Sequence, residues 1–304
     1  MATGLLMLRP QHFGWNSETS SSNAFQTSQP QSLPDLTAQQ GLREFDAMHS
    51  RLLEAGLQVT VLTDRKEVPC PDAVFLNNLF CTLPDGGLIH FPMEAPSRRL
   101  EKRDDLAHLL IEAGYRVAYE SDWSDWAHQG QFLEGTGSMV LDHDHRCAYA
   151  AFSTRTSPEL FERWCHEIGY DGWGFDSADA NGRPYYHTNV LMSLGQNLAL
   201  LAAEALDPWG QKELIKRLNS TGRDVLLLSP AQIECFGANV LQVDHPEGHR
   251  CWIASETAVR AWGPELRDRI EADGEIISVS IPTIEKIGGG SARCMLAENY
   301  LPLL

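Results

Sequence analysis

Cys294 is the strongest candidate for a reactive group in this sequence, because it follows a run of three glycines and lies next to Arg293. A free cysteine is most often a small buried apolar residue, and that interpretation stays open. The glycines, however, allow a tight approach of the chain and leave backbone N–H groups uncovered, which stabilises a thiolate and an oxyanion. Arg293 would add positive charge. The pattern therefore indicates a nucleophile.

A histidine and a carboxylate could assist such a nucleophile. His187 stands two residues before Asn189, and in the strand that we expect there the two side chains share a face. A histidine packed in the core is the alternative. Glu134 begins an otherwise apolar stretch, where an unpaired carboxylate is costly to bury. Glu134 therefore either faces solvent or pairs with a group such as an imidazole.

Helices and strands alternate along the chain and must position these residues. Five helices are expected after the capping residues Thr37, Ser97, Ser157, Asp207 and Ser255, each closed by a glycine, with Pro264 as a kink in the last one. Four of them lead into β-rich segments. Those segments are 58–62, 115–119, 224–228 and 275–279, and strand–turn–strand stretches at 75–80, 132–140, 187–192 and 236–241 precede the last four helices.

The helix starts are about 50–60 residues apart, which indicates a repeat array of ββαβ-type modules. A further strand from Ala292 to Leu296 would complete the first module, Leu5 to Leu62, and close the array into a ring without exposed strand edges. The sequence therefore predicts an α/β protein with a single domain over residues 1–304. Glu134, His187 and Cys294 then occupy equivalent strand starts of different modules, which converge on the axis of the ring.

Composition excludes several classes of partner. The net charge of −17 and the pI of about 5.0 oppose binding to nucleic acid or to an anionic membrane. No apolar run approaches the roughly 20 residues that span a bilayer, and the first ten residues do not resemble a signal peptide. The seven cysteines are odd in number, widely spaced and without a CxxC pair, as expected for reduced thiols in the cytoplasm.

Other conspicuous segments receive a structural interpretation. The stretch from Ser17 to Pro34 is rich in Ser, Gln, Asn and Pro and predicts a long surface loop. The run from Asp142 to His145 resembles a metal cluster, but it falls on an expected hairpin turn, so we predict a solvated turn and no metal site. Trp123 and Trp126 are expected to pack in the helical shell or to shape a lid.

Several of these segments together resemble the guanidine-modifying superfamily, which includes arginine deiminases, amidinotransferases and dimethylarginine dimethylaminohydrolases. The resemblance extends over nearly the whole chain. It implies the five-bladed α/β-propeller of that superfamily, with pseudo-fivefold symmetry, which is called the pentein fold. The opening segment is more similar to the citrulline ureidase (citrulline utilisation hydrolase) branch. The segments concerned are 133–138, 153–156, 187–189, the glycine-rich loop before Cys294 and, for the branch, 7–10, 16–19 and 23–26.

The resemblance also implies roles for individual residues. Cys294 would be the nucleophile, His187 the general acid and base, and Glu134 the carboxylate that orients the histidine. Arg155 and Arg98, the latter in a turn with Arg99, resemble the contacts to the carboxylate of an amino-acid substrate, a role that suits a guanidinium.

This sequence departs from the family pattern at two substrate-binding positions. Arginine-binding members hold the guanidinium with aspartates, and here Asn78 and Asn189 stand at those positions. Two amides pair poorly with a buried cation but suit a neutral ureido group. The departure therefore favours citrulline over arginine as substrate.

The sequence thus predicts a cysteine-dependent hydrolase that cleaves the ureido C–N bond of citrulline through a covalent thioester. The products would be ornithine, carbon dioxide and ammonia, and no cofactor is expected. The alternatives are a deiminase or dimethylaminohydrolase acting on arginine or another guanidino compound, and a propeller that binds an amino acid without catalysis. The expected partner is a small amino-acid substrate, and the oligomeric state, including a homodimer, stays open.

Overall fold

Strands in the computed structural model, which describes residues 1–2, 4–28 and 34–304, form five three-stranded sheets. In every sheet the middle strand pairs antiparallel with one neighbour and parallel with the other. The sheets are β15 (Ala297–Asn299), β1 (Gly4–Arg9) and β2 (Gln58–Thr63); β3 (Phe80–Thr82), β4 (Gly87–His90) and β5 (Tyr119–Asp122); β6 (Val140–Asp142), β7 (Cys147–Phe152) and β8 (Asp171–Asp176); β9 (Met192–Leu194), β10 (Leu198–Leu201) and β11 (Asp224–Leu227); and β12 (Leu241–Asp244), β13 (Arg250–Ser255) and β14 (Glu275–Val279).

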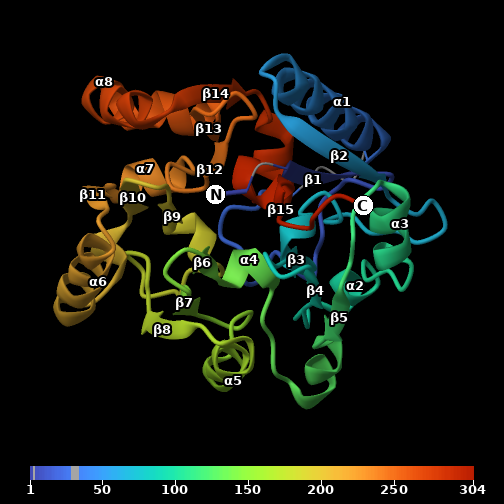
Figure 1. Ribbon diagram of the computed structural model, residues 1–304, viewed down its shortest axis with the longest axis horizontal. Helices are drawn as coiled ribbons and strands as arrows, with labels where there is room; N and C mark the ends of the chain where they lie inside the picture. The colour runs from blue at the N-terminus through green and yellow to red at the C-terminus, as the bar shows by residue number, and fades with distance from the viewer. Residues whose placement is uncertain (3, 29–33) are drawn as a thin grey trace.

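A helix connects the two parallel strands of each sheet. Figure 1 shows the sheets following one another around the molecule in chain order, with these helices on the outside. The repeated strand–helix–strand unit that the sequence predicts is therefore confirmed. Closure of the sheets into a five-bladed propeller stays a prediction. The helices are α1 (Pro34–Glu54), α3 (Leu106–Glu112), α5 (Pro158–Ile168), α6 (Pro208–Ser220) and α8 (Glu256–Asp273).

Three of the predicted helix starts are confirmed. Ser157, Asp207 and Ser255 are the N-cap residues of α5, α6 and α8. The Asp207 carboxylate accepts the backbone N–H groups of Trp209 and Gly210, which otherwise have no partner within the helix. The kink in α8 is also confirmed, because Gly263 has a φ of 71° directly before the proline.

The other two starts are wrong. Thr37 lies inside α1, which begins at Pro34. The helix expected from Ser97 to Gly114 is broken into α2 (Pro96–Arg99) and α3. Between the two helices the Arg103 guanidinium bonds to the carboxylate of Asp105, the N-cap residue of α3, and the chain turns there.

Single helical turns replace the predicted strand starts. The short helices η1 (Leu76–Asn78), α4 (Gly135–Ser138) and η3 (Thr188–Val190) each lead into the first strand of a sheet. The predicted strand from Ala292 to Leu296 is also wrong, because η6 (Ala292–Met295) occupies it and the strand that completes the first sheet is β15. The remaining short helices are η2 (Ser124–Gln129), η4 (Ala203–Ala205), α7 (Pro230–Glu234) and η5 (Ile284–Gly288).

The middle strands form the core between the outer helices and the centre of the molecule. Strand β1 is buried from Gly4 to Leu8, and the middle strands β4 and β10 are buried along their whole length. Strands covered on both faces are expected to be continuously apolar, and the buried residues of β1 and β10 are, whereas β4 ends in the buried His90. No described helix is long and apolar enough to cross a membrane.

Replacement of Leu6 in β1 tests how much the sheet that joins the two chain ends contributes to stability. Leu6 is fully buried, so Leu6→Ala should lower the free energy of unfolding by roughly 2–5 kcal/mol, measured by chemical denaturation. Leu53→Ala is the control, because Leu53 on α1 is 49% exposed and its loss should cost less than about 0.5 kcal/mol. Equal losses would contradict this description of the core.

Candidate active site

Glu134 and His187 form a buried pair across two neighbouring sheets. Glu134 is the N-cap residue of α4 and His187 is the N-cap residue of η3. The Nε2 atom of His187 lies 2.8 Å from Oε2 of Glu134, and both side chains are almost completely buried. The structure therefore brings together two residues that lie 53 positions apart in the chain. The sequence left open whether Glu134 faces solvent or pairs with an imidazole, and in the structure it pairs with His187.

Two arginines and one backbone amide surround the Glu134 carboxylate. Oε1 accepts the backbone N–H of Glu94 at 2.9 Å, while Nη1 of Arg98 and Nη1 of Arg155 lie 3.8 and 3.7 Å from Oε2. Burial by itself raises the pKa of this carboxyl, but Arg155, the hydrogen bond from His187 and Arg98 outweigh it and lower the pKa to about 2. Glu134 is therefore ionised at neutral pH.

His187 is neutral at the same pH. Burial lowers its pKa to about 4, although Glu134 acts in the opposite direction. Because Nε2 faces a carboxylate, the proton of the neutral ring belongs on Nε2, which leaves Nδ1 as an acceptor. Gly137 makes room at that atom, since a Cβ there would lie 2.7 Å from Nδ1 of His187 and 2.3 Å from Nδ2 of Asn78.

Cys294 lies in η6, with its sulfur between two asparagine amides. Nδ2 of Asn239 is 3.3 Å from Sγ, and Nδ2 of Asn189 is 3.6 Å from it. Burial raises the pKa of the Cys294 thiol, and the two amide donors act against that rise. Arg293 points elsewhere, to Glu298 and the carbonyl of Leu296, although its charge also favours the thiolate.

The three glycines before Cys294 allow a close approach of the chain, as the sequence predicts. A Cβ on Gly288 or Gly290 would lie 2.6 or 2.9 Å from the ring of Phe75, so both glycines allow that ring to pack against the loop. Gly289 has a φ of 67°, a conformation that favours glycine. The backbone N–H of Cys294 itself bonds to the carbonyl of Ser291. The backbone of Ser291, directly after the glycines, bonds to the Cys294 thiol and lowers its pKa against the effect of burial.

Arg98 supports Asn78. Nη1 of Arg98 donates to Oδ1 of Asn78 at 2.7 Å, and Nδ2 of Asn78 donates to the neighbouring Asn77. The same guanidinium donates to both oxygens of Glu101 and to the carbonyl of Phe75. Arg98 is 2% exposed, so its charge depends on these partners.

A covering segment, residues 16–27, lies over this group of side chains. Nη2 of Arg155 donates to the carbonyl of Thr19 and to Oγ of Ser22, and Asn23 donates to the carbonyl of Gly289. Asn16, Thr19 and Asn23 are buried. The predicted surface loop from Ser17 is confirmed over the described residues 17–28, although Thr19 and Asn23 within it are buried, and residues 29–33 lie outside the described residues.

Five of the seven predicted site residues line one cavity of about 10 Å³. They are Asn78, Arg98, Arg155, His187 and Cys294. Glu134 lies behind His187, and Asn189 lies against the sulfur. Arg98 rather than Arg99 reaches this cavity.

Two residues of the site escaped the sequence prediction. Asp72 lines the cavity, and its Oδ2 accepts hydrogen bonds from Asn16 and Thr19. Its Oδ1 is buried and has no hydrogen-bond partner among the described residues, and burial raises its pKa. The cavity therefore contains a carboxylate, whereas the sequence predicts the amides of Asn78 and Asn189 where other family members have aspartates. The sequence contained a feature that could have identified Asp72, because this carboxylate interrupts an apolar stretch as Glu134 does.

Asn239 is the second missed residue. It lies in the predicted stretch at 236–241, but its type alone gave no reason to choose it from the other asparagines. In the structure it is fully buried, and its Nδ2 donates both to the sulfur of Cys294 and to the carbonyl of Asn189. Its position next to the sulfur follows only from the packing of η6.

The remaining predicted features lie away from this cavity. Asp142 ends β6 at the expected hairpin, but it is buried, and its carboxylate bonds to Arg223 and His145 rather than to solvent. Trp123 is buried in the hydrophobic cluster between the second and third sheets, and Trp126 packs against that cluster, which agrees with the helical-shell interpretation.

Histidines and acidic residues also meet at the β12–β13 hairpin. His245, Glu247 and His249 lie close enough there to hold an ion. Both ring nitrogens of His245 already bond to the backbone, at Ala55 and Glu247, which leaves that ring no free nitrogen as a ligand.

Comparisons with known proteins identify the family and the fold of the chain. The family model for N,N dimethylarginine dimethylhydrolase, eukaryotic, matches residues 9–301. A search of curated proteins gave no match. Among solved structures, the apo form of ArgZ, an arginine dihydrolase from the ornithine-ammonia cycle in cyanobacteria, is similar with a TM-score of 0.72 and 16% identity, over 99% of this chain and 41% of ArgZ.

Two further structures are similar at comparable levels. A cysteine-to-alanine mutant of AgrE with L-arginine has a TM-score of 0.69 and 14% identity, over 97% of this chain and 40% of AgrE. A dimethylarginine dimethylaminohydrolase adduct has a TM-score of 0.66 and 15% identity, over 98% of this chain and 100% of that protein. The chain thus spans about two-fifths of ArgZ and AgrE. The match over residues 9–301, together with the shared mixed α/β fold, shows that the chain belongs to the N,N-dimethylarginine dimethylhydrolase family of the guanidine-modifying superfamily.

Proposed function

We propose that this protein hydrolyses the ureido C–N bond of citrulline, with Cys294 as nucleophile. The observation that carries the proposal is the neutral surroundings of the sulfur, which contacts the amides of Asn189 and Asn239. Amides can donate to and accept from a ureido group, whereas a guanidinium beside them would lack a counter-charge. The reacting end of the substrate is therefore neutral in this proposal.

Charged residues that line the same cavity fit the charged end of citrulline. Asp72 has a free carboxylate oxygen that suits an α-ammonium group, and Arg98 and Arg155 supply positive charge for the α-carboxylate. The arginines are buried and held by other contacts, so they are fixed before a substrate arrives. A cavity of about 10 Å³ admits roughly one water molecule, so the covering segment must move to admit an amino acid.

The protonation states of the site define the chemical steps. Nδ1 of the neutral His187 takes the thiol proton as Sγ attacks the ureido carbon, and the imidazolium is stabilised by Glu134. The C–N bond to the ornithine side breaks, and His187 returns the proton to the leaving amine. Water, deprotonated by His187, then cleaves the carbamoyl thioester to carbamate and free thiol. Carbamate decomposes to carbon dioxide and ammonia.

The similar structures support this assignment. AgrE was solved with ornithine and NAD+, and the N-terminal domain of ArgZ was solved with its product. Ornithine is the amine that hydrolysis of citrulline releases, and AgrE, of which this chain spans about two-fifths, binds ornithine. We further infer that the five sheets are the blades of a propeller, that residues 1–304 form one catalytic domain, and that the protein acts in the cytoplasm.

A guanidino compound, such as arginine or a methylated arginine, is the second candidate substrate. Asp72 favours it, because a buried carboxylate with a free oxygen could also pair with a guanidinium. The family model, which describes a dimethylarginine dimethylhydrolase, points in the same direction. In this alternative ammonia or an alkylamine would leave first and citrulline would be the product.

Product analysis decides between the two candidates. The purified protein is incubated with citrulline, arginine, dimethylarginine or agmatine, and amines and ammonia are quantified. Citrulline should give equal amounts of ornithine and ammonia, and Cys294→Ser should abolish both because the serine hydroxyl is a much weaker nucleophile. Formation of citrulline from arginine or dimethylarginine would overturn the proposal, and turnover of none of the four would indicate a binding protein.

The neutral state of His187 predicts activity at unusually low pH. A histidine with the ordinary pKa of about 6.5 is roughly nine-tenths protonated at pH 5.5, whereas His187, with a pKa of about 4, still accepts a proton there. The kcat/KM for citrulline at pH 5.5 should therefore stay within about twofold of its value at pH 7. Initial rates at citrulline concentrations below KM, measured from pH 4 to 8, give the pH dependence of kcat/KM and test this prediction. A loss of kcat/KM towards acid pH with a midpoint near pH 6.5 would contradict it.

Asn189→Asp tests the requirement for a neutral group beside the sulfur. A carboxylate there would raise the pKa of the thiol and oppose the negative charge that forms on the substrate oxygen, so kcat/KM for citrulline should fall at least about tenfold. Alkylation of Cys294 by iodoacetamide should slow in parallel. Asn219→Asp, at an exposed site, is the matched control, and equal activities of the two variants would refute the argument.

A further inference from the structure

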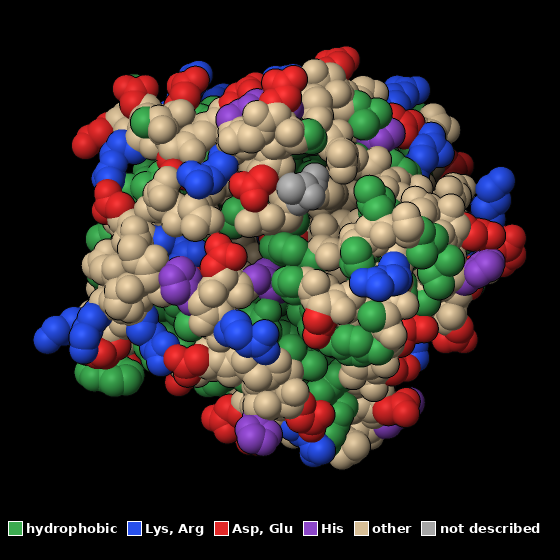
Figure 2. Space-filling model, viewed as in Figure 1, with side chains coloured by type: hydrophobic (Ala, Val, Ile, Leu, Met, Phe, Trp, Pro, Cys, Tyr) green, Lys and Arg blue, Asp and Glu red, His purple; other side chains and the backbone are tan. Residues whose placement is uncertain are grey.

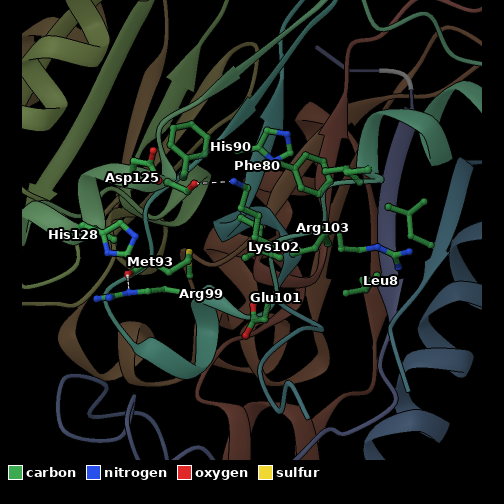
Figure 3. Close-up of a pocket in the computed structure, with 17 residues that line it drawn as sticks. Leu8, Phe80, His90, Met93, Arg99, Glu101, Lys102, Arg103, Asp125 and His128 are labelled. Atoms are coloured by element: carbon green, nitrogen blue, oxygen red, sulfur yellow. Dashed lines mark hydrogen bonds between the residues drawn. The ribbon is translucent and has the colours of Figure 1, made fainter. Parts of the chain in front are cut away.

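A second cavity, of about 260 Å³, lies beside the second sheet and has an apolar floor. It shares no lining residue with the catalytic cavity, and the two adjoin where Glu101 of this cavity bonds to Arg98 of the catalytic one. In Figure 3 the carboxylate of Glu101 points away from the ammonium group of Lys102. The floor includes Leu8, Leu62, Leu76, Leu79, Phe80 and Met93.

Basic side chains stand at the rim of this cavity. Arg99, Lys102 and Arg103 line it within five positions of the chain, although the protein as a whole has a net charge of −17. Figure 2 shows acidic and basic side chains interspersed on the face that it presents, without one patch of a single sign. Two carboxylates, Glu101 and Asp125, line the same cavity, so the cations outnumber the acidic groups there by one.

The cations differ in how far their charge is compensated. Lys102 pairs with Asp122 and Arg103 pairs with Asp105. Arg99 instead donates to the carbonyls of Met93 and Glu94 and lies over the ring of Phe132. Its charge acts on the carboxylate of Glu18, and it forms no closer ion pair among the described residues. Arg99 therefore retains a positive charge that an incoming anion can neutralise.

We propose that this cavity binds a small carboxylate with an apolar tail. The carboxylate lies against Arg99 and Lys102, and the tail packs on the leucines and Phe80 of the floor. The volume is slightly below the roughly 300–1,000 Å³ of pockets for drug-sized ligands, which limits the tail to a medium-length chain or one ring. The tail accounts for the apolar floor, and the carboxylate accounts for the basic rim.

Calorimetric titration of the whole protein tests the site with defined probes. Octanoate and 4-phenylbutanoate carry the proposed head group on a linear or a ring-bearing tail, whereas 1-octanol and octylamine lack the negative charge. At least one carboxylate should bind about tenfold or more tightly than octanol and octylamine. Equal affinity for octanoate and octanol, or no binding of either carboxylate, would overturn the proposal.

Two variants locate the binding. Arg99→Gln removes the unpaired charge and should weaken carboxylate binding about tenfold, while Lys212→Gln, at an exposed site on α6, should leave it unchanged. Ala127→Leu fills the cavity from its wall without altering a charge and should also abolish binding. Octanoate binding that survives both cavity variants, or that disappears in Cys294→Ser, would place the ligand elsewhere and refute the assignment independently of the enzymatic proposal.

Discussion

The buried carboxylate of Glu134 is the group on which the site depends. It receives a hydrogen bond from His187, another from the backbone of Glu94, and the charge of Arg98 and Arg155. A carboxylate buried without such partners would be protonated or would destabilise the fold. Because its partners come from several parts of the chain, the sheets must be assembled before the ion pair exists. Catalytic geometry and folding are therefore linked through one side chain.

The arrangement of charge within the cavity follows from this centre. Glu134 balances the arginines on one side, and Asp72 faces the covering segment on another. The sulfur of Cys294 lies among amides, where neither sign of charge predominates. The site thus combines charged groups, suited to the ends of an amino acid, with amides that contact the nucleophile. That combination is the physical basis for preferring a ureido substrate in the proposed function.

Glycines and single helical turns make this close packing feasible. Gly135 has a φ of 49°, and a Cβ there would lie 2.3 Å from the carbonyl of Asn77, so only glycine allows α4 to approach η1 this closely. Gly137 provides the same freedom beside His187. A helical turn directs its side chains differently from a strand, and this allows residues at the ends of separate sheets to meet.

The sequence alone determined the repeated strand–helix–strand plan, the caps at Ser157, Asp207 and Ser255, and the candidates Glu134, His187 and Cys294. Local signals suffice for these, since capping, apolar periodicity and a polar residue in an apolar stretch are properties of neighbouring residues. The tertiary structure decided that Asn239 touches the sulfur, that Asp72 faces the cavity, and that residues 16–27 cover it. It also placed helical turns where strands were predicted. These features depend on contacts between residues far apart in the chain, and no local pattern of residue types specifies which of several asparagines or loops will make them.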